Sequence, residues 1–121
     1  MKILIAEDDA PSRILLERKL ASWGYEVIAT EDGNQAWDAV QKESPDIAIL
    51  DWLMPELSGI DVCRRIRNAE NLPYIYIILI TAQDQDEDII AGFDAGADDY
   101  ILKPFDEDIL RSRVSVGAHA A

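Results

Sequence analysis

Five polar side chains follow short apolar runs of the chain, and their types suit the binding of a divalent cation or the receipt of a phosphoryl group. They are Glu7, Asp8, Asp51, Thr81 and Lys103. Ligands that are all oxygen select a hard ion such as Mg²⁺, which keeps several waters and uses one or two carboxylates. An aspartate can also be the nucleophile that takes a phosphoryl group, and such a transfer depends mostly on positioning and on neutralising negative charge.

Asp51 is the most prominent of these residues. It ends the apolar run 47–50, which is typical of a strand buried on both faces, and Pro55 follows soon after. A buried strand would hold this carboxylate out at its end, where chemistry can take place. From this stretch alone, a carboxylate that merely opens a turn would be an equally good interpretation.

The alternation of strands and helices shows how the five residues could meet. Apolar runs predict strands at residues 3–6, 27–29, 47–50, 74–80 and 100–102. Helical patterns lie between and after them, at about residues 11–23, 36–43, 60–67, 89–97 and from 106 towards residues 117–121, which we expect to be frayed. This order requires crossover connections and predicts a doubly wound α/β domain with a five-stranded parallel sheet and helices on both faces. Parallel strands end at one edge of the sheet, so the five polar side chains would converge there.

Composition and charge limit the class of protein. The 121 residues are enough for one domain and not comfortably for two, and 49% of them are hydrophobic, which indicates a folded chain. The formal net charge of −13 argues against direct binding to nucleic acid or to an anionic membrane surface. It suits a bound cation or a partner with a basic face, although an acidic surface also serves solubility alone. No stretch is as long as a membrane-spanning helix.

The single cysteine, Cys63, excludes an internal disulfide and favours a reducing cytoplasm. It lies three residues from Ile60 and from Ile66 in a helical pattern, so we interpret it as a packed thiol and not as a nucleophile. The same pattern predicts that Arg64, Arg65 and Arg67 point outward.

The motifs at the predicted strand ends resemble those of the receiver domains of two-component response regulators. The resemblance covers about the whole chain and is carried by four stretches: residues 7–11, 51–59, 81–82 and 96–105. It implies a flavodoxin-like sheet in the order 2-1-3-4-5, and one receiver domain over residues 1–121 with no output domain in this chain. The stretch from Pro73 to Thr81 is longer than is usual for that family, so we expect its strand to be bulged at the beginning or to start late.

The resemblance assigns the metal and phosphoryl sites residue by residue. Asp51 matches the residue that accepts a phosphoryl group from a histidine kinase or a phosphotransfer protein. The cofactor implied is Mg²⁺, with Mn²⁺ as a substitute, and its ligands would include Asp51 itself. Asp8 would bind the ion directly, Glu7 through water, and Leu53 through its backbone carbonyl.

The resemblance also implies the groups that contact the phosphoryl oxygens and transmit the change. Lys103 would pair with the phosphoryl group, its bond to Pro104 should be cis, and Ala82 would contribute a backbone contact. Thr81 and Tyr100 match a switch pair, in which the hydroxyl moves to a phosphoryl oxygen and the aromatic ring turns inward.

Two positions of the implied site differ from what rapid hydrolysis needs. Leu53 lies two residues after Asp51, and Gln83 lies two residues after Thr81. In the family these two side chains tune hydrolysis of the acyl phosphate. Leu53 cannot orient a water molecule, so we expect a long phosphoryl lifetime.

The resemblance also implies a homodimer through the face made by the predicted fourth helix, fifth strand and fifth helix. Asp98, Asp99 and Arg113 could form ion pairs across it. Ile89 and Ile109 stand where DNA-binding relatives place a charged pair, which is consistent with a hydrophobic contact. Ile109 as an ordinary core residue is an equally good interpretation.

The leading hypothesis is a cytoplasmic, phosphorylation-driven switch that catalyses only its own phosphorylation and dephosphorylation and is no enzyme on an external substrate. The alternative is a phosphorylation-independent protein-binding module of the same fold, which normally lacks one of the site residues, whereas none is missing here. A small phosphatase with an aspartyl nucleophile needs a second acid two residues after Asp51, and Leu53 occupies that place.

Overall fold

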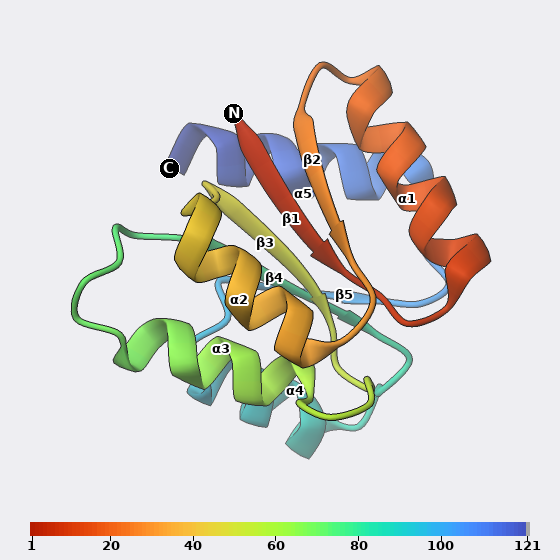
Figure 1. The fold of residues 1–121 in the computed structure, drawn as a ribbon. Coiled ribbons are helices and arrows are strands. Elements are labelled where there is room, and N and C mark those ends of the chain that lie inside the picture. Colours follow the sequence, from red (N-terminus) through yellow and green to blue (C-terminus); the bar gives the residue numbers. More distant parts are fainter. Residues whose placement is uncertain (121) are drawn as a thin grey trace.

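The computed structural model describes residues 1–120, in which five strands alternate with five helices (Figure 1). The strands are β1 (Lys2–Ala6), β2 (Glu26–Thr30), β3 (Ile47–Asp51), β4 (Tyr76–Thr81) and β5 (Asp99–Leu102). The helices are α1 (Ala10–Ser22), α2 (Gly33–Glu43), α3 (Gly59–Asn68), α4 (Asp86–Asp94) and α5 (Glu107–Ala120). Neighbouring strands are parallel and their order is β2-β1-β3-β4-β5. The predicted doubly wound sheet and its strand order are confirmed.

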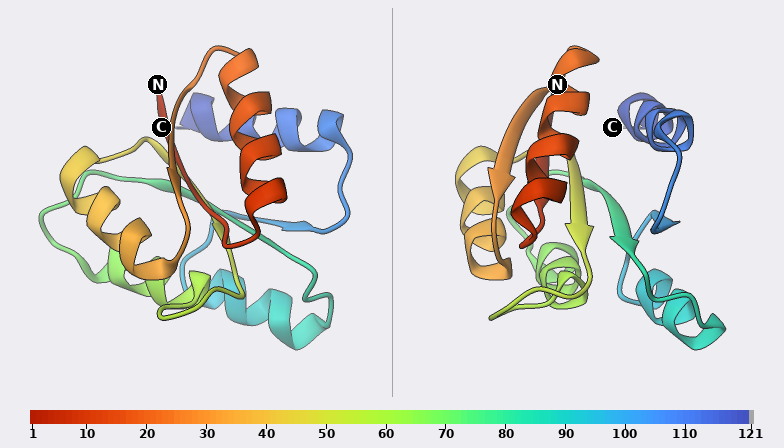
Figure 2. Two further views of the ribbon diagram at one scale, coloured as in Figure 1. Left: turned by 45° about the vertical axis from the view of Figure 1, so that its right-hand side comes forward. Right: turned by 90° about the vertical axis from the view of Figure 1, so that its right-hand side faces the viewer.

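Alternate residues of each strand face two separate apolar cores, because successive side chains of a strand point to opposite faces. Leu4 and Leu79 belong to the core beneath α2 and α3, whereas Ile3 and Ile49 belong to the core beneath α1 and α5. Figure 2 shows these helices in layers on either side of the sheet. Burial on both faces explains why the strands are continuous apolar runs. Among residues 1–120, no helix combines the length and the apolarity needed to cross a membrane.

Strand β4 starts late, at Tyr76, which is one of the two outcomes expected from the long stretch before Thr81. Side chains from other elements bind the backbone where the strand begins. The Asp98 carboxylate accepts a hydrogen bond from the Ile77 N–H at 2.8 Å, and the Arg67 guanidinium donates to the Ile75 carbonyl at 2.7 Å. On the side that faces β5, these contacts take the place of strand pairing, which begins there only at Ile78.

Arg67 does not point outward as the helical pattern predicted. Besides the Ile75 carbonyl, its guanidinium donates to the Gly96 carbonyl at 2.8 Å and to Asp98 at 2.7 Å, and it lies over the Tyr74 ring. The planar fork of an arginine can satisfy several acceptors at once, and here it joins α3 to the beginning of β4 and to the loop before β5.

Helix α5 continues to Ala120, so the prediction of fraying from residue 117 is wrong for the residues described; Ala121 lies outside them. Gly117 is buried, and a Cβ atom there would lie 2.7 Å from Cδ1 of Tyr76. The absent side chain lets the last turn of the helix pack directly on β4, and this contact holds the end of the helix in place.

Candidate functional site

Strand register brings Glu7 and Asp51 together. Ala6 of β1 is the partner of Leu50 of β3, so the next residues along the two strands, Glu7 and Asp51, are neighbours on one face of the sheet. Both side chains are buried, with 3% of Glu7 and 7% of Asp51 exposed. Two adjacent carboxylates that are both buried cannot easily be ionised together unless a positive charge lies beside them.

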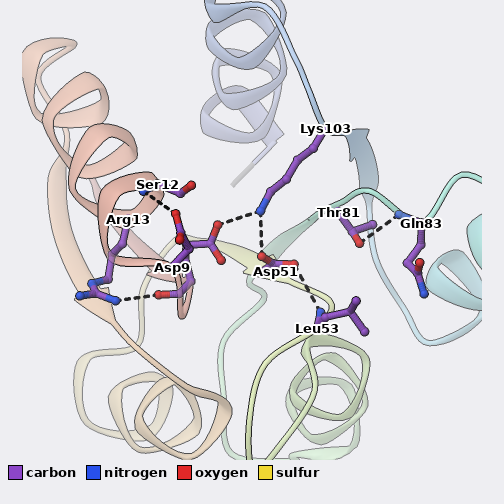
Figure 3. A network of polar contacts seen from close by, with 9 residues as sticks. Asp9, Ser12, Arg13, Asp51, Leu53, Thr81, Gln83 and Lys103 are labelled. Carbon is purple, nitrogen blue, oxygen red and sulfur yellow. Dashed lines mark hydrogen bonds and ion pairs between the residues drawn. The ribbon is translucent and has the colours of Figure 1, made fainter.

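Lys103 provides a positive charge. Its backbone N–H donates to the Thr81 carbonyl at 2.8 Å, which fixes the chain just beyond β5. From there its Nζ reaches Asp51 Oδ2 at 2.8 Å (Figure 3). It also reaches Glu7 Oε1 at 2.7 Å. The bond between Lys103 and Pro104 is cis, as predicted.

One ammonium does not fully neutralise two carboxylates in this setting. Burial raises the pKa of Glu7 to about 7, the neighbouring Asp51 adds to the rise, and Lys103 offsets only part of it. Burial opposes the charge on Lys103, but its hydrogen bonds to Asp51 and Glu7 outweigh that effect and raise its pKa above the usual range. The site therefore favours either a proton on Glu7 or a second cation.

The residues present fit a hard divalent cation. Glu7, Asp8 and Asp51 each offer a carboxylate oxygen, and these oxygens lie within 4.8 Å of one another. Asp8 is exposed, whereas Oε2 of Glu7 is buried and has no hydrogen-bond partner among residues 1–120. A buried lone pair and a donor set that is all oxygen are what Mg²⁺ requires.

Leu53 meets the site through its backbone. Its N–H donates to Asp51 Oδ1 at 3.3 Å (Figure 3), while 61% of the residue is exposed. The structure thus places Leu53 beside Asp51. The role of its carbonyl as a metal ligand stays a prediction.

Thr81 and Tyr100, the predicted switch pair, are connected through the backbone of Gln83. Thr81 is buried and its Oγ1 accepts a hydrogen bond from the Gln83 N–H at 3.2 Å (Figure 3). The Tyr100 hydroxyl donates to the Gln83 carbonyl at 2.7 Å. The sequence analysis singled out Gln83 only for its side chain, so this link through the backbone was missed.

Ala82, the predicted backbone contact of the phosphoryl group, lines a cavity of about 470 Å³ that Glu7 and Lys103 also line.

Arg13 is a further residue of the site that the sequence did not single out. Its guanidinium donates to the Glu7 carbonyl at 3.0 Å and pairs with Glu31 at 3.3 Å. Asp9 caps α1 by accepting from the Ser12 N–H, so the segment just after β1 is held from both sides (Figure 3). The i+6 spacing from Glu7 to Arg13 matches no repeating pattern, which explains the omission.

The charged residues expected at a dimer face are paired within the chain. Asp98 binds Arg67, and Asp99 binds Arg113 at 3.1 Å. Ile109 is exposed, so its interpretation as a core residue is wrong, whereas Ile89 is half-buried. Ion pairs from one protomer to another stay a prediction.

Comparison with known proteins points to one family for nearly the whole chain. Residues 3–115 match the response regulator receiver domain. The probable transcriptional regulators ycf27 of Porphyridium aerugineum and Guillardia theta are 41% and 42% identical over 113 residues, which make up 93% of this chain. Those residues are 46% and 43% of the two relatives, so the chain spans less than half of their length.

Solved structures agree with the sequence matches. The receiver domain of the Francisella response regulator 1452 is 32% identical and has a TM-score of 0.89, with 96% of this chain and 94% of that chain covered. The BeF3-activated N-terminal receiver domain of Klebsiella pneumoniae RstA is 30% identical and has a TM-score of 0.90, with 97% of both chains covered.

Replacing the buried carboxyl of Glu7 by an amide should stabilise the metal-free chain. Because the pKa of Glu7 is raised from 4.5 to about 7 on folding, its ionisation lowers stability progressively as pH rises through this interval. We expect Glu7→Gln to increase the free energy of unfolding by about 1–3 kcal/mol at pH 8 and by less at pH 5. Urea titrations in a chelator would measure both, with Glu26→Gln at an exposed strand position as the control. An equal gain at both pH values would contradict the electrostatic explanation.

Proposed function

The chain belongs to the response regulator receiver domain family, and we propose that Asp51 accepts a phosphoryl group from a histidine kinase or a phosphotransfer protein. The observation that carries the proposal is the buried Asp51 carboxylate, held 2.8 Å from the Lys103 ammonium at the carboxyl edge of the sheet. A nucleophile fixed beside a cation is the arrangement that phosphoryl transfer needs, since the reaction depends on positioning and on charge neutralisation.

The transfer can be written from the residues present. An Asp51 oxygen forms a bond to phosphorus while the bond from phosphorus to the donor's imidazole nitrogen breaks, and the electron pair of that bond stays on the nitrogen. The product is an aspartyl acyl phosphate. Lys103 would move its hydrogen bond from the carboxylate to a phosphoryl oxygen, joined by the Thr81 hydroxyl and the Ala82 N–H. Mg²⁺ held by Glu7, Asp8, Asp51 and the Leu53 carbonyl would neutralise charge on the phosphoryl oxygens.

Thr81 would carry the change away from the site. Its hydroxyl now accepts from Gln83, whose carbonyl is bound by Tyr100. A hydroxyl that turns to donate to a phosphoryl oxygen disturbs this link, so phosphorylation would bias the positions of the β4–α4 loop and of the Tyr100 ring. The result would control a partner or an attached effector domain, and the only chemistry would be the chain's own phosphorylation and dephosphorylation, in the cytoplasm.

An apolar surface on α4, β5 and α5 supports a homodimer. Phe93, Leu102 and Ile109 are exposed, Phe93 contacts the Tyr100 ring, and Tyr100, Leu102 and Ile109 line a shared hollow of about 330 Å³. We include this face in the proposal because it adjoins the proposed switch residue directly.

Phosphorylation can be tested by intact mass after incubation with acetyl phosphate. We expect a gain of one phosphoryl group that requires Mg²⁺ and is absent in Asp51→Asn, since only the carboxylate can attack phosphorus. A wild-type chain that gains nothing while its circular dichroism shows an intact fold would favour the alternative, a protein-binding module that works without phosphorylation.

Hydrolysis of the acyl phosphate should be slow, because the largely exposed Leu53 side chain offers no group to orient water. Leu53→Asn should shorten the lifetime by a factor of about 3–10, the effect of one added hydrogen bond. The decay of the phosphorylated mass after donor removal measures this, and Leu53→Met is the matched apolar control. An unchanged decay in the asparagine variant would contradict the explanation.

Dimerisation can be followed by sedimentation velocity at rising protein concentration with and without beryllofluoride as a phosphoryl mimic. Beryllofluoride should increase the dimer fraction, and Ile109→Glu should abolish that increase because it buries a charge in the contact. Leu15→Glu on the exposed side of α1 is the control. A monomer at every concentration in both states would exclude the dimer.

A further inference from the structure

Tyr100 connects three segments that surround the site. Its ring meets Trp52, in the loop after β3, edge to face at 6.2 Å between centroids, and meets Phe93 of α4 at 6.3 Å. Its hydroxyl donates to the Gln83 carbonyl in the loop after β4. Burial, with smaller contributions from Asp88 and Asp84, raises the pKa of this phenol to about 12. The ring therefore packs on the loop after β3 and on α4, and its hydroxyl binds the loop after β4.

The space for that ring is provided by Gly92, the seventh residue of the nine-residue helix α4. Gly92 is buried, and a Cβ atom there would lie 2.9 Å from both Cδ2 and Cε2 of Tyr100 and 3.0 Å from Cδ1 of Leu79. Real Cβ atoms essentially never lie as close as the two 2.9 Å contacts with Tyr100, and the 3.0 Å contact with Leu79 is tight, so one neighbour would have to move. Leu79 is fully buried in the core, whereas Tyr100 is half-buried at its margin, so the ring is the group that would yield.

Helix propensity does not explain a glycine here. Glycine inside a helix is less stable than alanine, and Gly92 lies six residues after the start of a nine-residue helix. Its φ is not in the left-handed region that would favour glycine, unlike the φ of Gly24 and Gly96. The explanation that remains for a glycine at position 92 is the direct packing of the α4 backbone on the Tyr100 ring.

We propose that Gly92 is the positioning residue of Tyr100: its missing side chain makes room for the ring and so determines how often the Tyr100 hydroxyl reaches the Gln83 carbonyl. A methyl group at this position turns the ring outward, breaks that hydrogen bond and releases the β4–α4 loop, whose Gln83 N–H binds Thr81. The consequence for phosphorylation rests on the proposed function. The outward turn of the ring and the loss of its hydrogen bond to Gln83 do not.

The position of the ring can be read by fluorine NMR of the chain labelled with 3-fluorotyrosine. The four tyrosines give four signals, which single Tyr→Phe variants assign. Gly92→Ala should move the Tyr100 signal towards its position in the urea-unfolded chain and leave those of Tyr25, Tyr74 and Tyr76 in place.

Gly117→Ala is the matched control, because Gly117 of α5 faces the Tyr76 ring in the same way that Gly92 faces Tyr100. This variant should move the Tyr76 signal and leave Tyr100 unchanged. A Tyr100 signal that stays in place in folded Gly92→Ala would overturn the proposal.

Stability provides a second measurement if Gly92→Ala folds poorly. Removal of the ring should remove the conflict with Tyr100, so Gly92→Ala should destabilise the Tyr100→Ala chain less than it destabilises the wild type, because better helix propensity then opposes only the 3.0 Å contact with Leu79. A Gly92→Ala change that destabilises the Tyr100→Ala chain as much as the wild type would show that the clash is not with Tyr100, and would overturn the proposal as well.

The rate of phosphorylation by acetyl phosphate tests the link to the site. Gly92→Ala should slow it by a factor of about 3–10, as for one lost hydrogen bond, and should have no further effect in Tyr100→Phe, which already lacks the hydroxyl. An equal slowing in both backgrounds would overturn the link through the Tyr100 hydroxyl. If the wild type takes up no phosphoryl group, the proposed function fails, while the NMR result still decides the role of Gly92.

Discussion

The buried charge balance among Glu7, Asp51 and Lys103 is the constraint on which the rest of the site depends. Strand register leaves the two carboxylates no freedom to separate, and the backbone contact of Lys103 to Thr81 brings one ammonium to both. The balance is incomplete, because burial first and then the neighbouring Asp51 raise the pKa of Glu7 despite the contact with Lys103. A divalent cation would complete it, and a phosphoryl group on Asp51 would shift it again, because it brings more negative charge to the same place. The charge balance at the site would therefore change both when a cation binds and when Asp51 carries a phosphoryl group.

The sequence was sufficient to predict the residues at the strand ends, because this prediction needs only local patterns and one rule of topology. A buried strand is visible as an apolar run, and parallel strands share an edge, so Glu7, Asp51 and Lys103 could be placed together without coordinates. The late start of β4 was only one of two expected outcomes. It depends on Asp98, which lies 21 residues from Ile77 in the sequence, and on Arg67 of α3; both reach the beginning of β4 in space.

Other features were missed for different physical reasons. The link from Thr81 to Tyr100 uses the backbone of Gln83, and every residue has these groups, so no side-chain motif marks it. Arg67 was assigned to the outer face because its place in the helical repeat says nothing of acceptors that other elements bring to it. Fraying was expected from residue 117, whereas the missing side chain of Gly117 is what allows the helix to pack on Tyr76.

The contacts of Asp98 have a mechanical consequence. Its carboxylate accepts from Arg67 of α3, from Tyr74 and from the backbone of β4, and its own N–H donates to the Ile77 carbonyl. The amino ends of β4 and β5 are thereby clamped to one another and to a helix, at the edge of the sheet opposite Asp51. The register of β4 against β5 is thereby fixed by side chains as well as by the strand ladder, and it is fixed at the end of the sheet away from the proposed chemistry.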